Sequence, residues 1–273
     1  MTTQGSRMRP RHFIGLLPVI VAVLMPVGSA AADQLDDIRT RGRLHVGVSE
    51  TSPPFSWRDG EKGVVGYDVD LAARVAQRLG VAMDKVPVVN AQRIPALQQG
   101  LVDLVASGMT RAENRRRDID FSLAYLVSPH KVIVRRDSGI TKVHDLAGRK
   151  LALVKSASVD AELKQAVPTL QIVTFDDYPA CFAAVAERKV DGFLADEVLL
   201  LSFAHKSGVP QDFALIADYV LPRTAGFGIK KDEPRWKTFV DETLLALEAS
   251  GDAQKIFDAW FAPVTRSFRI TRE

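Results

Sequence analysis

One run of fifteen residues, Gly66–Gly80, constrains the fold of this chain more than any other feature. A glycine leads into an aromatic and acidic start, Tyr67-Asp68, and apolar residues then recur at positions 71, 72, 75, 76 and 79. That spacing places them on one face of a helix. Gly80 provides the C-terminal stop. The run therefore predicts an amphipathic helix that packs against a core.

Strand and helix patterns alternate along the chain, which predicts an α/β fold. Leu44, Val46 and Val48 alternate with polar or small residues, and apolar runs at 101–106, 151–154, near 172 and at 190–195 predict further strands. Helical spacing predicts helices at 95–99, from about 159, up to 188, around 239–247 and around 256–261.

A short internal echo indicates two similar α/β units, with a chance match as the alternative. Residues 96–103 end in Val102-Asp103, and residues 184–191 end in Val190-Asp191, each as a helix, a turn and the start of a strand. In such sheets ligands bind beyond the carboxyl ends of the strands. We therefore expect residues 107–110 and Asp196 to lie near a shared cleft.

The chain of 273 residues has a formal charge of +3, which arises entirely near the N-terminus. The first 32 residues hold Arg7, Arg9 and Arg11 and no acidic residue, so the remainder has 33 basic residues of the total 36, equal to the 33 acidic residues. A near-neutral mature chain offers no electrostatic argument for binding nucleic acid.

Residues 1–32 have the pattern of a secretory signal peptide. The three arginines precede an apolar run over 13–27, and Ala30 and Ala32 fit a cleavage site that leaves Asp33 as the mature start. A membrane anchor is the alternative, but the run is short and contains Pro18 and Pro26. We expect a soluble protein exported to the periplasm.

Cys181 is the only cysteine, so it forms no intrachain disulfide, and its apolar surroundings predict a buried core thiol. The five histidines show no spacing typical of metal ligands. We expect neither a metal nor a cofactor.

The chain resembles the bacterial extracellular solute-binding proteins of family 3 over about residues 35–261. Four segments carry the resemblance: 66–80, 107–115, 120–125 and 224–229. The resemblance implies a two-lobed periplasmic binding protein fold (type II), with two α/β lobes joined by hinge crossovers near 123–125 and 220–224. It implies that residues 33–124 and 223–273 form lobe 1 and that residues 125–222 form lobe 2.

A free amino acid presents a carboxylate and an ammonium group, so its site needs donors for one and acceptors for the other. Residues 107–115 resemble the family's carboxylate clamp. This implies that Arg115 and the Thr110 hydroxyl bind the α-carboxylate, and that the Gly108 carbonyl accepts an ammonium proton. On spacing alone, the crowded arginines at 111, 115, 116 and 117 indicate a solvated basic loop instead.

On lobe 2, Asp196 matches the family's ammonium-binding acid, although an acid at a strand end is also a common helix N-cap. Ser158 aligns with a turn whose backbone N–H groups can bind an anion, or it serves only as an N-cap. Ala157 stands where the family usually has glycine.

The resemblance implies five further residues of the ligand site: Ser49, Ser52, Phe55, Arg93 and Tyr178. The positions of Ser49 and Ser52 usually contact the ligand's side chain. Phe55 ends a loop typical of the family, and Tyr178 aligns with another position in the cleft. Two depart from the family pattern, since Ser49 replaces an acid or arginine and Ser52 replaces an aromatic residue. In the glutamate- and aspartate-binding branch an arginine matching Arg93 approaches the ligand's side-chain carboxylate; bracing of a helix start is the alternative.

The resemblance implies a monomeric, non-catalytic binding protein that delivers a polar amino acid, acidic ones first, to the membrane permease of an ABC importer. Two alternatives stay open. One is an enzyme on the same scaffold, similar to cyclohexadienyl dehydratases, with Glu50 or Glu197 as a general acid. The other is an accessory protein that presents its ligand to a membrane receptor.

Overall fold

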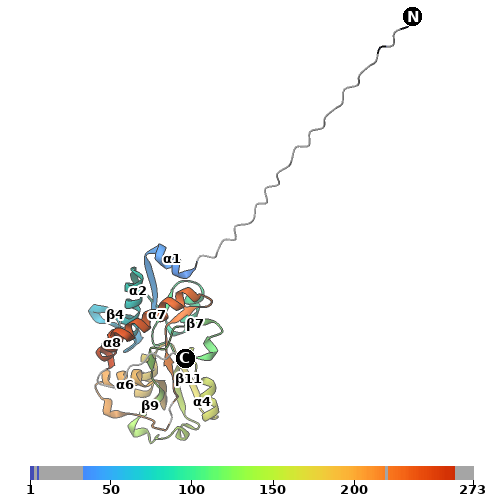
Figure 1. Ribbon diagram of the computed structural model, residues 1–273. Helices are drawn as coiled ribbons and strands as arrows, with labels where there is room; N and C mark the ends of the chain where they lie inside the picture. Colours follow the sequence, from blue (N-terminus) through green and yellow to red (C-terminus); the bar gives the residue numbers. More distant parts are fainter. Residues whose placement is uncertain (3–4, 6–32, 219–220, 262–273) are drawn as a thin grey trace. The chain divides into compact units, whose positions relative to one another are not determined.

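The computed structural model describes residues 1–2, 5, 33–218 and 221–261 (Figure 1). The predicted signal peptide falls outside this part of the chain, except for residues 1, 2 and 5. The helices are α1 (Gln34–Arg41), α2 (Tyr67–Leu79), α3 (Arg93–Gln98), α4 (Asp160–Ala166), α5 (Tyr178–Ala186), α6 (Glu197–Lys206), α7 (Pro234–Ser250) and α8 (Asp252–Phe261). The strands are β1 (Arg43–Val48), β2 (Thr51–Ser52), β3 (Ser56–Asp59), β4 (Gly63–Val65), β5 (Ala82–Pro87), β6 (Leu104–Ala106), β7 (Ile119–Phe121), β8 (Leu126–Val127), β9 (His130–Arg135), β10 (Lys150–Val154), β11 (Gln171–Phe175), β12 (Gly192–Asp196), β13 (Phe213–Leu215), β14 (Thr224–Ala225) and β15 (Gly228–Lys230).

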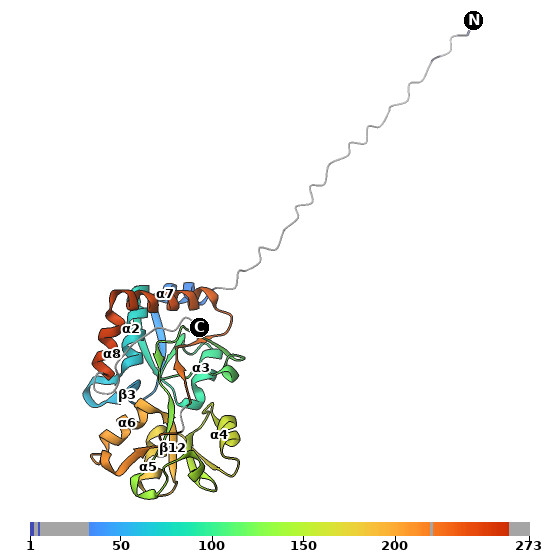
Figure 2. The ribbon, with the colours of Figure 1, turned by 60° about the horizontal axis from the view of Figure 1, so that its bottom comes forward.

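Two five-stranded sheets form the cores of two α/β lobes. The first sheet has the order β5-β1-β6-β15-β7 and the second β11-β10-β12-β9-β13. In each, the first three strands are parallel, and the fourth runs antiparallel to both its neighbours. Helices α2, α7 and α8 lie with the first sheet, and α4, α5 and α6 lie with the second (Figures 1 and 2). The α/β prediction is confirmed.

The internal echo has a structural counterpart. Asp103 and Asp191 precede β6 and β12, which are the third strands of their sheets. Each carboxylate accepts a 2.8 Å hydrogen bond from a backbone amide of the neighbouring strand. Asp103 accepts from His45 of β1, and Asp191 accepts from Lys150 of β10. The repeated Val-Asp therefore joins equivalent strands in both lobes.

The chain passes between the lobes twice, and the two passages pair with each other. Strand β8 and strand β14 form a separate antiparallel ribbon, with Ala225 opposite Leu126. The predicted crossover near 123–125 lies directly before β8. The other predicted crossover, near 220–224, begins at a residue outside the described part of the chain. The lobe boundaries themselves stay predictions.

The signature helix forms as its spacing predicts. Leu71, Ala72, Val75 and Ala76 are buried on one face of α2, and Gly80 ends the helix in the left-handed conformation. At the other end, Gly66 has φ +146°, and a Cβ there would lie 2.2 Å from the carbonyl oxygen of Phe55. Only glycine lets the backbone at the start of α2 lie this close to the turn between β2 and β3.

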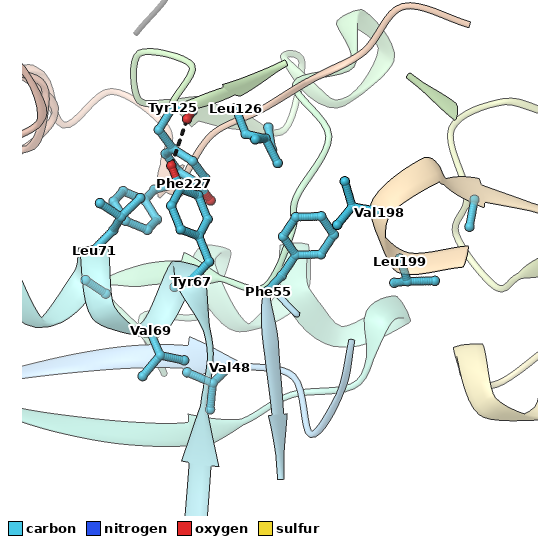
Figure 3. Close-up of a cluster of buried hydrophobic side chains, with 14 of the residues drawn as sticks. Val48, Phe55, Tyr67, Val69, Leu71, Tyr125, Leu126, Val198, Leu199 and Phe227 are labelled. Carbon is cyan, nitrogen blue, oxygen red and sulfur yellow. Dashed lines mark hydrogen bonds between the residues drawn. The ribbon is translucent and has the colours of Figure 1, made fainter. Parts of the chain in front are cut away.

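The hydrophobic core continues from lobe 1 to the edge of lobe 2. Phe55 lies near Tyr67 on one side and faces Val198 and Leu199 of α6 on the other (Figure 3). Phe261 of α8 completes this cluster, 4.8 Å from Tyr67 and 6.1 Å from Phe55 between ring centroids. These residues pack α6 against the turn between β2 and β3.

The strand prediction at 101–106 is too long. Strand β6 begins only at Leu104, and Leu101 is 59% exposed in the turn after α3. The apolar run begins before the strand. Val102 packs in the core but does not pair in the sheet.

Candidate functional site

The predicted site residues gather where strands of both sheets end. The segment 107–115 follows β6, and Asp196 is the last residue of β12. Side chains at such strand ends lie at one edge of a sheet, where ligands of open α/β folds bind.

Arg115 is a buried cation that contacts both lobes. It lies in the short 3-10 helix η3 (Glu113–Arg115), is 9% exposed, and donates hydrogen bonds to the carbonyl oxygens of Thr110 at 3.0 Å and Ser156 at 2.8 Å. Burial, and secondarily Arg93, lowers the pKa of the guanidinium to about 10. In the described part of the chain, no carboxylate forms an ion pair with it. A buried guanidinium held only by carbonyl dipoles is suited to an incoming anion.

Gly108 holds the clamp loop in an unusual conformation. Its φ is +62°, and a Cβ there would lie 2.7 Å from the ring of Phe55. Its amide donates a 2.6 Å hydrogen bond to Oδ2 of Asp68. The loop therefore depends on glycine at this position and on a carboxylate of α2.

Asp196 performs the N-cap role that its position predicts. Its Oδ1 accepts hydrogen bonds from the amides of Val198 at 2.9 Å and Leu199 at 3.4 Å. Burial raises the pKa of this carboxyl to about 6 in spite of those bonds. An ammonium group nearby would stabilise the charged form, so capping and ligand binding are compatible.

His130 connects Asp196 to the clamp segment. It begins β9 and pairs with Asp196 across the sheet, while its Nε2 lies 3.5 Å from the hydroxyl of Thr110 in the other lobe. Burial, and then Arg223 and Arg115, lowers the pKa of the imidazole to about 3, so it is neutral at physiological pH. His130 thus lies between Asp196 of lobe 2 and Thr110 of the segment 107–115.

Arg93 lies beside the site and braces it. The side chain is 3% exposed and donates to the carbonyl oxygens of Asn90 at 3.2 Å and Ser107 at 3.3 Å. Arg93 and Arg115 line a cavity of about 260 Å³, with Asn90 and Arg117 among the other lining residues. The bracing alternative is thus observed, and the same side chain also faces a strongly basic cavity.

The two serines expected at the ligand's side chain are turned toward each other. The Ser52 hydroxyl, fully buried, donates to Oγ of Ser49 at 2.8 Å, and Ser49 Oγ also accepts from the amide of Thr51. Phe55 is buried in the lobe 1 cluster. These three residues shape the loop from inside. A second cavity, about 160 Å³, lies beside Ser49 and reaches Asp176 and Asp177 of lobe 2.

The remaining predicted residues lie on lobe 2. The buried hydroxyl of Ser158 has no hydrogen-bond partner among the described residues, and it lines a cavity of about 500 Å³ that also includes Arg111 and Arg223. Tyr178 begins α5, and its ring stands 6.3 Å from the ring of Phe193. No hydrogen bond from Ser158 caps the helix that follows, α4.

Sequence reasoning missed two residues of this region, Asp68 and His130. Asp68 stands in the signature run but looks like an ordinary acidic residue in a first helical turn. His130 begins a strand, and only the pairing with β12 shows that it lies beside Asp196. The contacts that place both residues at the site come from distant parts of the chain, so no short stretch of sequence reveals them.

Several other features of the described residues carry no candidate site. Cys181 is fully buried, and burial raises its thiol pKa to about 12, so the predicted core thiol is confirmed. A cavity of about 580 Å³ between α6, β9 and β13 is lined mainly by apolar residues, which does not suit a zwitterion. Within the described residues, no helix has the length and apolar character to span a bilayer, and no cluster of metal-binding side chains occurs.

Comparisons with known proteins identify relatives of this chain by sequence and by structure. The model of the bacterial extracellular solute-binding proteins, family 3, matches residues 44–263. The glutamate/aspartate import solute-binding protein of Escherichia coli strain K12 is 24% identical over 89% of this chain and 86% of its own length. The L-cystine-binding protein TcyJ of the same strain is 25% identical over 93% of this chain and 96% of its length. The crystal structure of an ancestral amino acid-binding protein, a precursor of cyclohexadienyl dehydratase, superposes with a TM-score of 0.75 at 29% identity, covering 84% of this chain and all of that one.

Proposed function

Because this chain belongs to the bacterial extracellular solute-binding proteins of family 3, we propose that it captures a free amino acid between its two lobes and delivers it to an ABC importer. The buried guanidinium of Arg115 carries this proposal. It crosses from the clamp segment to Ser156 on lobe 2, and its hydrogen bonds within the described residues go to carbonyl oxygens, not to a carboxylate. A ligand carboxylate would supply that partner, and Asp196 would receive the ammonium group.

The protein acts by closure of its lobes. Ligand binding to both lobes stabilises the closed arrangement because each charged group of the ligand finds its partner on a different lobe. The closed, monomeric protein then docks on the membrane permease. The pattern of residues 1–32 supports export to the periplasm, where such a protein would meet its solute.

Acidic amino acids are the first choice of ligand. One cavity is lined by three guanidinium groups, those of Arg93, Arg115 and Arg117, and by one carboxylate, that of Asp118, so its charged lining is net positive. The amide nitrogen of Asn90 in its wall is buried without a partner among the described residues. One relative is named for glutamate and aspartate, but another is named for L-cystine. A side-chain carboxylate would satisfy the basic cavity better than a neutral or cationic group.

A thermal-shift screen against the twenty amino acids tests the proposal. A ligand that binds only the folded state stabilises it by RT ln(1 + [L]/Kd), about 2.7 kcal/mol at a hundredfold excess over Kd. We expect the largest shifts with glutamate or aspartate. The absence of a shift with every amino acid would contradict the proposed function.

The protein acts without catalysis in this proposal. The two glutamates considered as general acids both form ion pairs, Glu50 with Arg58 and Glu197 with Lys131, the latter at 2.9 Å. Each carboxylate thus has a cation of this chain as its partner instead of lying free to meet a substrate. Incubation with prephenate or arogenate checks this point, and the appearance of phenylpyruvate or phenylalanine would reveal an enzyme instead.

A further inference from the structure

We propose that Asp68 is a positioning residue for ligand capture, which ties the clamp loop to the hinge crossover and whose charge strengthens the binding of a ligand's ammonium group. This inference rests on the proposed function. Asp68 is fully buried, so it does not contact ligand itself. It acts through the backbone that it holds.

A single carboxylate oxygen joins two functional segments. Oδ2 of Asp68 accepts a 2.6 Å hydrogen bond from the amide of Gly108, in the clamp loop, and another of 2.6 Å from the hydroxyl of Tyr125, next to the hinge strand β8. Tyr67, the preceding residue, donates to the carbonyl oxygen of Tyr125 at 3.0 Å (Figure 3). The start of α2 thus makes two hydrogen bonds to Tyr125 at the crossover and one to the clamp loop.

The second oxygen of Asp68 is buried and has no hydrogen-bond partner among the described residues. The charged groups that act on this carboxyl are Asp196 of β12 and Arg93 of α3, which oppose each other. The hydroxyls of Tyr67 and Tyr125 also face it, and their pKa values lie well above the ordinary value, so both are neutral. Burial is the main reason that the pKa of Asp68 rises to about 7.

A ligand that places an ammonium group at Asp196 changes this balance. The negative charge of Asp196 contributes to the raised pKa of Asp68. A positive charge bound at Asp196 offsets that contribution, and it therefore favours the ionised form of Asp68. By linkage, a ligand that favours the ionised form binds more tightly when that form is already populated. Affinity should then rise as the pH increases from 6 to 8, above the separate titration of Asp196.

The substitution Asp68→Asn separates charge from position. The amide oxygen can still accept from Gly108 and Tyr125, but the side chain no longer ionises. Asp70→Asn is the matched control, because Asp70 lies on the same helix and accepts a 2.8 Å bond from Trp260, away from the clamp. Calorimetry is run from pH 6 to 8 with the amino acid that gives the largest thermal shift.

We expect the wild type and Asp70→Asn to gain affinity by about fivefold over this range if the ligand lowers the pKa of Asp68 by about one unit from its value of about 7. Asp68→Asn should keep binding but show a profile that is flat above pH 7. The variant Tyr125→Phe removes a hydrogen bond that favours the charged form, so its profile should shift to higher pH. Equal profiles in the wild type and Asp68→Asn would overturn the inference.

Urea unfolding of the ligand-free protein provides an arm that needs no ligand. If no amino acid binds the wild type, the proposed function fails, and this arm still reports on Asp68. Its charge at the buried hinge predicts that wild-type stability falls from pH 6 to 8 more steeply than that of Asp68→Asn. Parallel stability profiles would show that Asp68 carries no titrating charge there, and the inference would fail by itself.

Discussion

The guanidinium of Arg115, on a loop of lobe 1, donates a 2.8 Å hydrogen bond to the backbone carbonyl of Ser156 on lobe 2. The same side chain donates to Thr110 of its own loop. One cation thus spans both sides of the cleft. Its buried positive charge is suited to attract a carboxylate.

Replacing Arg115 with alanine should weaken amino-acid binding by about 2–5 kcal/mol, because the ligand carboxylate would be buried without its partner. Calorimetry measures the change. Arg116→Ala is the control, since Arg116 is exposed and pairs with Glu113 at 3.2 Å. Equal affinity for Arg115→Ala and Arg116→Ala would remove Arg115 from the site.

Two substitutions of Asp196 distinguish its capping role from its ligand role. Asparagine is as good an N-cap as aspartate, so Asp196→Asn should keep stability while losing at least about tenfold in affinity through the missing charge. Asp196→Ala should also lose about 0.5–2 kcal/mol of stability as the cap disappears. Urea unfolding and calorimetry are measured on both variants. Full affinity in Asp196→Asn would leave Asp196 as a cap only.

The ligand-free protein should become less stable as the pH rises from about 4 to 7. The carboxyls of Asp68 and Asp196 lose their protons near pH 7 and pH 6 in the folded state, but near the ordinary value of 3.8 in the unfolded chain. In this window the two carboxyls retain protons that the unfolded chain has lost. His130 offsets one of them, because burial lowers the pKa of its imidazole from 6.5 to about 3, so that only the unfolded chain protonates it here. Two protons against one leave the folded state with more, and the free energy of unfolding therefore decreases as the pH rises. Urea midpoints at several pH values check the slope, and a rising stability over the window would contradict the burial of these two charges.

The thiol of Cys181 should not react with a disulfide reagent until the protein unfolds. Its side chain is fully buried, and its raised pKa leaves almost no thiolate at pH 8. Reaction with Ellman's reagent, with and without denaturant, measures this. Rapid labelling of the native protein would show that the helix α5 opens readily or that the thiol is exposed.

Local sequence patterns predicted the parts of the fold that depend on local physics. The span of α2 follows from its apolar spacing and from Gly80, and the repeated Val-Asp anticipates two equivalent strands. By contrast, Leu101 is apolar yet exposed, since its turn faces solvent. Periodicity alone does not distinguish an apolar residue in a turn from one in a strand.

The site was predicted less completely, because orientation depends on distant contacts. Gly108 and Arg115 lie in the segment that follows β6, and Asp196 ends β12; their roles in ligand binding stay predictions. The hydroxyls of Ser49 and Ser52, however, bond to each other because the β2–β3 hairpin folds the loop inward. The environment of Asp68 comes from residues 40 and 57 positions away, Gly108 and Tyr125. Such contacts are not encoded in any short window of sequence.

A crystal structure of the protein with the amino acid that gives the largest thermal shift tests the central claim most directly. The account predicts both ligand carboxylate oxygens within hydrogen-bond distance of the Arg115 guanidinium, and the ammonium group beside Asp196. A ligand bound elsewhere, or bound in the cleft with its ammonium group at neither Asp196 nor the Gly108 carbonyl, would contradict it.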